Sequence, residues 1–259
     1  MVQVSYYDPE IDTPKMKATL LVVLTAGVFT NPGTALEIDQ KSCNFYMDFL
    51  KPAVESAFSM STITVEQLRN PSRTDSLPFN KLSEADQGND RSSDIFIYCD
   101  QKRLQQNTEG QWIDMEHRHA LDINHSKEMV PSCEGSTDIE AWTAVYDDGA
   151  AIIQLCPWFM QHLLKQFQNN GEYIYITPDA LNTIRDLSTR PPPSTLDKPL
   201  IDYFCVLDHT ILHELSHTPL GGRARDIAYG WANIGQLRST DRRQNADSYA
   251  YMGLGKIYY

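Results

Sequence analysis

The sequence predicts an α+β domain, in which helices lie outside a few short strands. Residues 40–59 carry apolar side chains at helical spacing, and residues 200–218 form a second, strongly helical segment. Between them, β-branched and aromatic residues gather in short runs bounded by turn residues, which is typical of strands. No fixed repeat period is present, which argues against a repeat protein.

The first half of the domain is expected to begin with the helix at 40–59. A short helix at 64–69 should follow, because Asn70-Pro71 ends the helical pattern there. Polar, turn-rich sequence predicts a loop over 72–93. The run Asp-Ile-Phe-Ile-Tyr at 94–98 predicts the first strand.

The second half is expected to add a weaker strand at 142–146 and a clear strand at 150–155. Cys156-Pro157 should open a helix that continues to residue 168, because proline is favoured at the first helical position. A short strand at 172–176 and the helix at 200–218 complete the predicted order.

Composition excludes several classes of protein. The 259 residues include 22 Lys and Arg against 34 Asp and Glu, which gives a formal charge of −12 and a sequence pI near 4.9. Proteins that bind nucleic acid through phosphates need a basic face, so no nucleic-acid partner is expected. With 41% apolar residues, the chain can bury a sizeable core.

The first 35 residues have the features of a secretory signal peptide. Lys15 and Lys17 stand at the front of an apolar run that ends at Thr30, and Gly33-Thr34-Ala35 supplies small residues for cleavage after Ala35. The alternative for the apolar run is a buried core helix, because it is too short to span a membrane comfortably.

The sequence allows two starts for this signal, because acidic residues precede Met16. Either Met1 opens an unusually long leader or Met16 is the true start. In both cases residues 36–259 form the expected domain. No later apolar stretch is long enough to cross a bilayer, so we expect no membrane partner after signal removal. With the signal peptide, we expect a secreted, extracellular protein, and we expect it to be a monomer.

The cysteines and one sequon agree with export. In an oxidising compartment, five cysteines predict two disulfides and one leftover thiol, and no CxxC pair suggests a zinc cluster. They are Cys43, Cys99, Cys133, Cys156 and Cys205. Asn124-His125-Ser126 is an acceptor sequence for N-glycosylation, so we expect Asn124 on the surface.

The most informative segment is His213-Glu214-Leu215-Ser216-His217. Residues four apart share one face of a helix, so the imidazoles of His213 and His217 can ligate one metal ion. Glu214 projects beside them, where a carboxylate can take a proton from a metal-bound water. The alternative is a pair of helix-face histidines that are hydrogen-bonded in a core.

A catalytic zinc ion needs a third protein ligand and an open fourth position. No histidine and no glutamate follow His217, so the downstream acidic side chains are Asp226, Asp241 and Asp247. A proline and two glycines after the motif allow the helix to end and the chain to reverse tightly. This reversal favours Asp226 as the third ligand.

Other histidines are less well placed. His209 lies one turn before His213, but it is eight residues from His217, about 12 Å along a helix axis. We therefore expect His209 to support the site or to pack. The group His117-Arg118-His119 with His125 is either a second metal site or a solvated polar loop, and the loop is favoured.

The motif and the residues after it resemble the aspzincin metalloendopeptidases, which are the deuterolysins and the peptidyl-Lys metalloendopeptidases. Their signature is HExxH followed by GTxDxxYG, and this chain continues with Asp226-Ile227-Ala228-Tyr229-Gly230. The segments 245–249 and 153–157 are also similar to parts of this family. The resemblance covers mainly residues 150–252.

The resemblance implies a zincin-like metalloprotease domain with an HExxH active-site helix, a small sheet and one catalytic zinc ion. Its substrate would be a protein or peptide, whose peptide bonds it hydrolyses. His213, His217 and Asp226 would be zinc ligands, Glu214 the general base, and Tyr229 the donor to the developing oxyanion.

The chain departs from the family in one loop, where Arg223-Ala224 replaces Gly-Thr and leaves the loop conformation open. Asp247 is a candidate for binding a basic substrate side chain or for approaching the metal, and a solvated acidic face is the alternative. Cleavage specificity, disulfide pairing and removal of a propeptide stay open.

Two other functional classes also stay open. One is a catalytically silent, zincin-like secreted binding or effector protein that keeps its metal site. The other is a purely structural metal with four protein ligands. The intact Glu214 and Tyr229 favour the enzyme.

Overall fold

The computed structural model of the chain describes residues 36–69, 95–135, 139–171 and 200–257, all of which belong to one unit that spans Asn31–Tyr259. The signal peptide expected at 1–35 lies outside the described residues. The loop expected at 72–93 and the strand expected at 172–176 also lie outside them.

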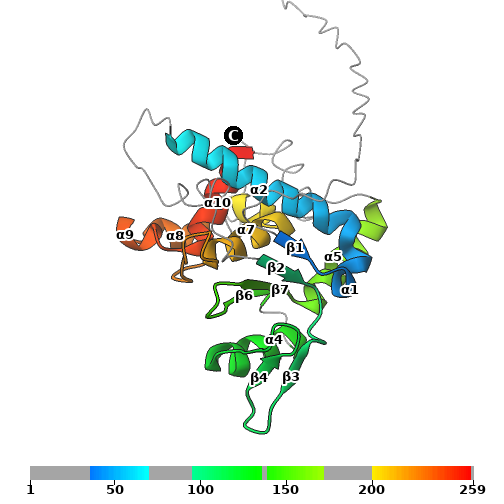
Figure 1. Cartoon of the computed structure of the whole chain (residues 1–259). Helices are drawn as coiled ribbons and strands as arrows, with labels where there is room; N and C mark the ends of the chain where they lie inside the picture. The colour runs from blue at the N-terminus through cyan, green and yellow to red at the C-terminus, as the bar shows by residue number, and fades with distance from the viewer. Residues whose placement is uncertain (1–35, 70–94, 136–138, 172–199, 258–259) are drawn as a thin grey trace, which may run out of the picture. The chain divides into compact units, whose positions relative to one another are not determined.

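The main sheet has four strands in the order β1-β2-β7-β6 (Figure 1). β1 (Leu36–Ile38), β2 (Ile95–Tyr98) and β7 (Ala151–Leu155) run parallel, and β6 (Ala141–Val145) pairs antiparallel with β7 at the edge. Every residue of β7 is buried, as expected for a strand with both faces covered. The predicted α+β class and three of the four predicted strands are therefore confirmed, while β1 was not predicted.

The N-terminal helices differ from the prediction at two points, because a 3₁₀ turn interrupts the helix predicted at 40–59 and the helix does not end at 59. α1 (Gln40–Cys43) and the 3₁₀ turn η1 (Asn44–Tyr46) lead into α2, which is continuous from Met47 to Arg69. The break predicted between 59 and 64 is thus wrong. α2 packs against α7 and α10, and tertiary packing of this kind can extend a helix beyond a weak local pattern.

The later helices follow the predicted order with one division. α5 (Pro157–Asn170) confirms the predicted helix. The helix expected at 200–218 is instead a 3₁₀ segment, η3 (Leu200–Phe204), followed by α7 (Leu207–His217). The extended backbone of Val206 separates the two.

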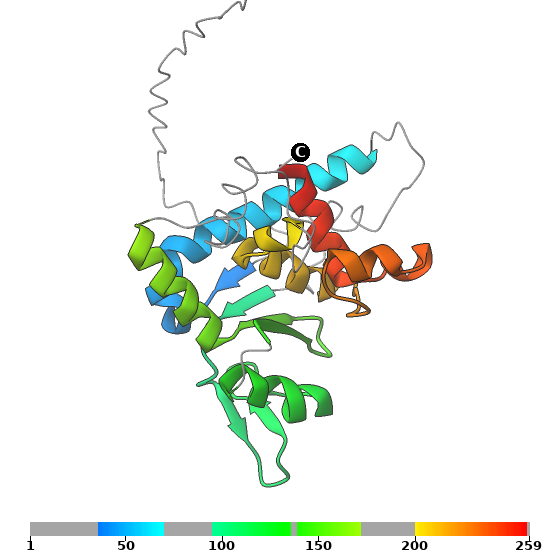
Figure 2. The same ribbon diagram turned by 180° about the vertical axis from the view of Figure 1, so that it is seen from behind.

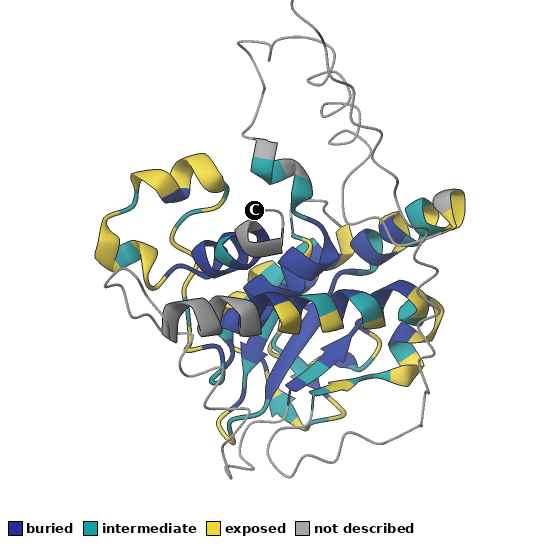
Figure 3. Cartoon of the chain, turned by 90° about the horizontal axis from the view of Figure 1, so that it is seen from above, coloured by how far each residue is buried: buried dark blue, intermediate teal, exposed yellow. Residues whose placement is uncertain are grey.

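Three helices complete the C-terminal part, and the sequence did not predict them. They are α8 (Trp231–Gln236), α9 (Ser239–Arg242) and α10 (Ala246–Ile257). α7 is the centre of the helical layer, because it packs against α2, α10 and β6, and its residues from Leu207 to Ser216 are all buried (Figure 3). Figures 1 and 2 show this layer on one side of the main sheet.

A second, antiparallel sheet lies at the other end of this unit (Figure 2). It consists of β3 (Leu104–Gln106), β4 (Trp112–Asp114) and β5 (His119–Ala120). The π-helix η2 (His125–Met129) and α4 (Val130–Gly135) follow it. The second sheet was not predicted, because its strands have only two or three residues.

A hydrogen-bond network around a buried ion pair joins the two sheets. Arg103 donates from Nε to Asp114 Oδ2 at 2.8 Å and from Nη1 to Gln154 Oε1 at 2.6 Å. The hydroxyl of Tyr146 donates to the same Asp114 oxygen at 2.9 Å. Since Gln154 belongs to β7, this network ties the small sheet to the centre of the large one.

Two disulfides are present, Cys43–Cys99 and Cys133–Cys156, and Cys205 is a free thiol. The number of each agrees with the sequence prediction, and the pairing is new. The first bridge joins α1 to the end of β2, and the second joins α4 to the start of α5. Within the described ranges, no helix combines the length and the apolar character that a membrane crossing needs.

Candidate metal centre

The HExxH residues lie in the last turns of α7. His213 and His217 share one face of the helix, and their Nε2 atoms are 3.2 Å apart. His213 and Glu214 are buried, and His217 is half-buried. The helix therefore presents two imidazole nitrogens at one point.

The chain reverses immediately after α7 and runs back along it. Ala224 donates its N–H to Ser216 O at 3.0 Å, and Arg223 donates to Thr218 O at 3.1 Å. This close return requires glycine at 221, because a Cβ there would lie 1.9 Å from the carbonyl oxygen of Leu215.

A parallel bridge then holds the returning chain beside the start of α10. Arg225 bridges Asn245, and the side chain of Asn245 accepts the N–H groups of Ile227 and Ala228 at 2.9 Å each. Asn245 is fully buried. It therefore fixes the backbone that carries Asp226, a role that sequence reasoning missed.

This loop brings Asp226 to the two histidines. Its Oδ1 lies 3.0 Å from His213 Nε2 and 3.3 Å from His217 Nε2. Among the described residues, these three form the one group of His, Cys, Asp or Glu side chains that could hold a metal ion. Tetrahedral zinc with bonds near 2.05 Å has ligand atoms about 3.3 Å apart, so the triangle suits zinc.

The other nitrogen of each imidazole is oriented by an acceptor. His217 donates from Nδ1 to Ala224 O at 2.9 Å, and His213 donates from Nδ1 to Asp247 Oδ1 at 3.1 Å. A carbonyl or a carboxylate accepts only, so Nδ1 is the donor in both contacts, and Nε2 is the nitrogen that would bind a metal ion once its own proton is displaced. Ligating histidines in metal sites are typically held in this way.

Asp247 does not lie on the surface, where a side chain that binds a basic substrate residue would be expected. It is buried, and its Oδ2 accepts the N–H of Gly230 at 2.7 Å while Oδ1 accepts from His213. Asp241, the remaining acidic side chain after the motif, pairs instead with Arg238 at 2.9 Å.

The carboxylates make the centre favourable for a cation. Burial alone would lower the pKa of His213, but the hydrogen bonds that its ring donates to Asp226 and Asp247 outweigh burial and raise that pKa to about 10. Burial likewise opposes the shift at Asp226, where the two histidines hold the pKa far below its usual range. Positive charge, as protons or as a metal ion, is therefore stabilised here.

Glu214 is held by a residue of the edge strand. The hydroxyl of Thr143 donates to Glu214 Oε2 at 2.6 Å and also lies 3.2 Å from Glu214 O. The carbonyl of Thr143 accepts a hydrogen bond from His125 Nε2 at 2.9 Å. Thr143 is 71 residues from Glu214 in sequence, so no local pattern signals this contact.

Tyr229 stacks on the candidate ligand His213. The two rings are 5.7 Å apart and nearly parallel, at 16°, and Tyr229 is 59% exposed. Loss of water around the phenol, together with the charge of Asp226, raises the pKa of Tyr229 well above its ordinary value. The phenol therefore stays protonated and can donate a hydrogen bond beside the candidate metal ligands.

Two further residues support the helix from behind the ligands. Burial lowers the pKa of His209 to about 4, so its imidazole is neutral, and its Nε2 lies 3.9 Å from Asp247 Oδ1. His209 packs edge-on against Tyr251 at 4.8 Å. Thr210, one turn before His213, donates to Glu140 Oε2 at 2.8 Å, and sequence reasoning missed this contact as well.

Three of the remaining histidines each contact a different partner away from the candidate metal centre. His117 Nε2 lies 2.8 Å from Tyr98 Oη, and His119 lies 3.3 Å from Asp148. His125 bonds the edge strand, as described above, so these three form no metal cluster within the described residues. Asn124, the sequon residue, is exposed.

Comparison with protein families connects this geometry to a known group. Residues 205–253 match the aspzincin family, described as lysine-specific metallo-endopeptidase. The resemblance to the aspzincins is confirmed. The matched segment contains the candidate metal-binding group, Glu214 and Tyr229, whereas Thr143 lies outside it. The aspzincin match supports a zinc metalloendopeptidase in general; neither curated proteins nor solved structures give a match.

The structure also accounts for the departure from the aspzincin signature. Arg223 stands where the signature has glycine, and it adopts the left-handed conformation with φ of 57°. Glycine adopts this conformation at no steric cost, whereas other residues lose roughly 1 kcal/mol or more. The loop therefore keeps a glycine-like conformation with an arginine in it.

Proposed function

We propose that this chain is a secreted zinc metalloendopeptidase with a zincin-like catalytic domain at residues 36–259 and a signal peptide at 1–35. The observation that carries the proposal is the convergence of His213, His217 and Asp226 within 3.0–3.3 Å, beside Glu214 on the same helix. Two disulfides also suit an oxidising, extracellular compartment.

Zinc is the cation that this donor set suits. Two imidazole Nε2 atoms and one carboxylate match catalytic zinc sites, whereas calcium and magnesium prefer oxygen ligands alone. Three protein ligands leave one position for water or substrate. Zinc held there would polarise the scissile carbonyl and make water acidic enough to react at neutral pH.

Glu214 then acts as the general base and acid. Its carboxylate accepts a proton from the attacking water and delivers it to the leaving amine. The hydrogen bond from Thr143 fixes Oε2 and keeps the carboxylate in one orientation during both transfers. Asp247 and Ala224 keep the two imidazoles in the tautomer that binds the metal.

Tyr229 supplies the last element of the mechanism. Its phenol donates a hydrogen bond to the oxyanion that develops when the carbonyl is attacked. Stacking on His213 sets the plane of its ring, and its exposure leaves it accessible to a substrate.

Glu214→Gln tests this proposal in the full chain expressed with its own leader and loaded with zinc. We expect casein hydrolysis to fall at least a thousandfold while one zinc per chain is retained, because glutamine keeps the shape and loses the base. A chelator should abolish wild-type hydrolysis, and added zinc should restore it.

The alternatives give different results. Casein hydrolysis that survives in Glu214→Gln would contradict the role of Glu214. One bound zinc without any hydrolysis by the wild type would indicate the catalytically silent protein. A zinc ion that resists chelators and binds no hydroxamate inhibitor would indicate a structural metal with four protein ligands.

A further inference from the structure

Large apolar side chains are exposed on the loop that carries Asp226. In the part of the chain that the structure describes, seven such side chains are exposed, and three of the seven lie within 227–231. Ile227, which follows Asp226 directly, is 39% exposed, and Trp231, the first residue of α8, is 48% exposed. Tyr229 is the third. Single exposed apolar residues need no explanation, whereas a group of them commonly marks an interaction site.

Ile227 and Trp231 flank Tyr229, and we name these two flanking residues the apolar rim. Each is two residues from Tyr229, and two residues of chain span at most about 7 Å between Cα atoms. The ring of Tyr229 itself lies 5.7 Å from that of the candidate ligand His213. Chain geometry therefore keeps the backbone of both rim residues close to the candidate metal centre.

The backbone of this segment is held by side chains from other parts of the chain. Four of the five amides in 227–231 donate to such side chains. Asp202 Oδ1 accepts the N–H of Trp231 at 3.1 Å, and Asn245 and Asp247 accept the other three. A surface that is already ordered loses little conformational entropy when it binds a ligand.

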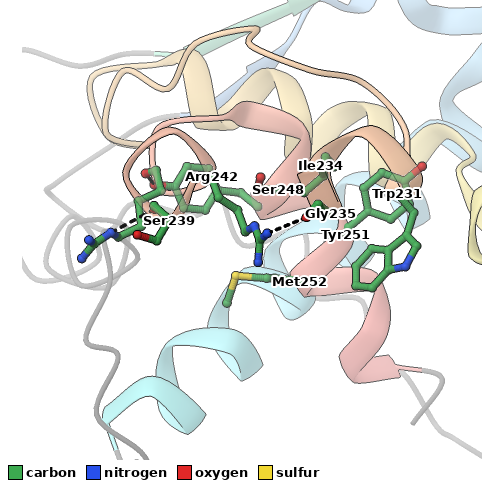
Figure 4. A pocket seen from close by; sticks show the side chains of 10 residues that line it. Trp231, Ile234, Gly235, Ser239, Arg242, Ser248, Tyr251 and Met252 are labelled. Carbon is green, nitrogen blue, oxygen red and sulfur yellow. Dashed lines mark hydrogen bonds between the residues drawn. The ribbon is translucent and has the colours of Figure 1, made fainter. Parts of the chain in front are cut away.

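The indole of Trp231 is supported on one side and open on another. Its ring lies 5.8 Å from that of Tyr251 in α10. It also lines a pocket of about 380 Å³, where Figure 4 shows it across from Ser239. The indole therefore borders open volume and is accessible to a ligand.

The size of the rim suits a single side chain better than a second protein. A stable protein interface buries about 800 Å² on each partner. A fully covered aromatic side chain buries roughly 150–250 Å², so two partly exposed residues offer far less than a dimer needs. One large apolar side chain of a peptide matches this area.

We propose that the apolar rim determines specificity by binding a large apolar side chain of the substrate, close to the scissile bond. This proposal rests on the metallopeptidase function and names a property of its substrates. The free energy comes from apolar surface that the indole and the isoleucine bury together with that side chain. It concerns a residue other than lysine, so it is compatible with the lysine specificity in the description of the matched family.

Three fluorogenic peptides test the rim with the zinc-loaded full chain. Each carries one lysine, and the residues two positions before and after it are both Phe, both Leu or both Ser. We expect kcat/KM for the Phe peptide to exceed that for the Ser peptide about tenfold. Salt does not screen apolar contacts, so this ratio should persist as salt rises. Equal kcat/KM values for the two peptides would overturn the proposal.

Variants of the rim locate the effect. In Ile227→Ser/Trp231→Ser, the Phe-to-Ser ratio should fall at least fivefold, whereas Ile227→Leu/Trp231→Phe keeps the apolar surface and should keep the ratio. The matched control Phe45→Ser/Ile123→Ser removes two exposed apolar side chains elsewhere and should also keep it. Because the rim is held through its backbone amides, the serine variant should still bind one zinc per chain. An unchanged ratio in that variant would contradict the proposal.

Tryptophan fluorescence separates the rim from the catalytic proposal. Trp231 is the one exposed tryptophan among the described residues, so acrylamide should quench it most strongly. In Glu214→Gln, the Phe peptide should protect it with a Kd about tenfold below that of the Ser peptide. This preference without any cleavage by the wild type would refute the proposed activity and leave the rim in place. Casein cleavage together with equal binding of both peptides would refute the rim alone.

Discussion

The hydroxyl of Thr143 on the edge strand donates a 2.6 Å hydrogen bond to the carboxylate of Glu214 on the central helix. The contact joins the sheet to the HExxH motif at the residue proposed as general base. It also makes Thr143 a positioning residue that acts through Glu214.

Removing that hydroxyl should slow the chemical step. Hydrogen bonds to charged groups contribute about 1.5–3 kcal/mol, so Thr143→Val should lower kcat about tenfold to hundredfold with little change in KM. Thr143→Ser keeps the donor and should retain most of the activity. Zinc content, measured on each variant, should stay at one per chain. Equal kcat values for the valine and serine variants would contradict the positioning role.

Metal binding should stabilise the fold. A ligand at a thousandfold excess over its Kd contributes about 4 kcal/mol, which corresponds to a rise in Tm of roughly 10 °C for a domain of this size. Asp226→Asn should lose most of this zinc-dependent rise, because it removes the third ligand charge. Asp241→Asn, which changes a surface ion pair, should keep it in the same thermal scans.

Close helix packing at Gly253 should be sensitive to a single methyl group. A Cβ at this position of α10 would lie 2.5 Å from Leu212 Cδ2 and 3.0 Å from Met60 Cβ. Gly253→Ala should therefore cost about 1–3 kcal/mol in urea unfolding. Gly235→Ala in α8 meets no atom within 4 Å and should be neutral or stabilising by up to about 1 kcal/mol. A larger loss of stability in Gly235→Ala than in Gly253→Ala would contradict this account of the packing.

The buried ion pair between Arg103 and Asp114 should govern stability in acid. Burial alone would raise the pKa of Asp114, but Arg103 and several hydrogen bonds outweigh it and lower that pKa. A carboxyl with a lowered folded pKa stabilises the fold above its unfolded value of about 3.9. This contribution is lost as the pH falls through the folded pKa, so stability should drop below about pH 4.

Asp114→Asn checks this account. It leaves the buried guanidinium of Arg103 unpaired and should cost about 3–5 kcal/mol at pH 7. Its unfolding free energy should also vary less with pH below 4 than that of the wild type. Asp148→Asn, at an exposed pair with His119, should change the free energy of unfolding by less than about 1 kcal/mol.

Local patterns were enough to predict the strands near 95, 141 and 151 and the helix with His213 and His217. Apolar runs and helical spacing depend on neighbouring residues, so a sequence displays them directly. A helix stop and two glycines indicate a reversal of the chain, which favoured Asp226 over Asp241 and Asp247 as the third ligand. The observed group of candidate ligands agrees with that choice.

The contacts that complete the site were beyond such patterns. Thr143 and Glu214 are far apart in sequence, and Arg225 meets Asn245 only through a single bridge. The second sheet depends on pairs of very short strands and on one buried ion pair. Such contacts arise from the tertiary fold, which a single sequence does not reveal.

The bridge at Arg225 has a dynamic consequence. Asn245 secures the amides that follow Asp226, while Asp247, two residues further on, orients His213. The ligand loop and the first turn of α10 should thus open together as one cooperative unit. Amide exchange of residues 225–230 and 245–248 should then share a single opening free energy, and zinc should slow both segments equally.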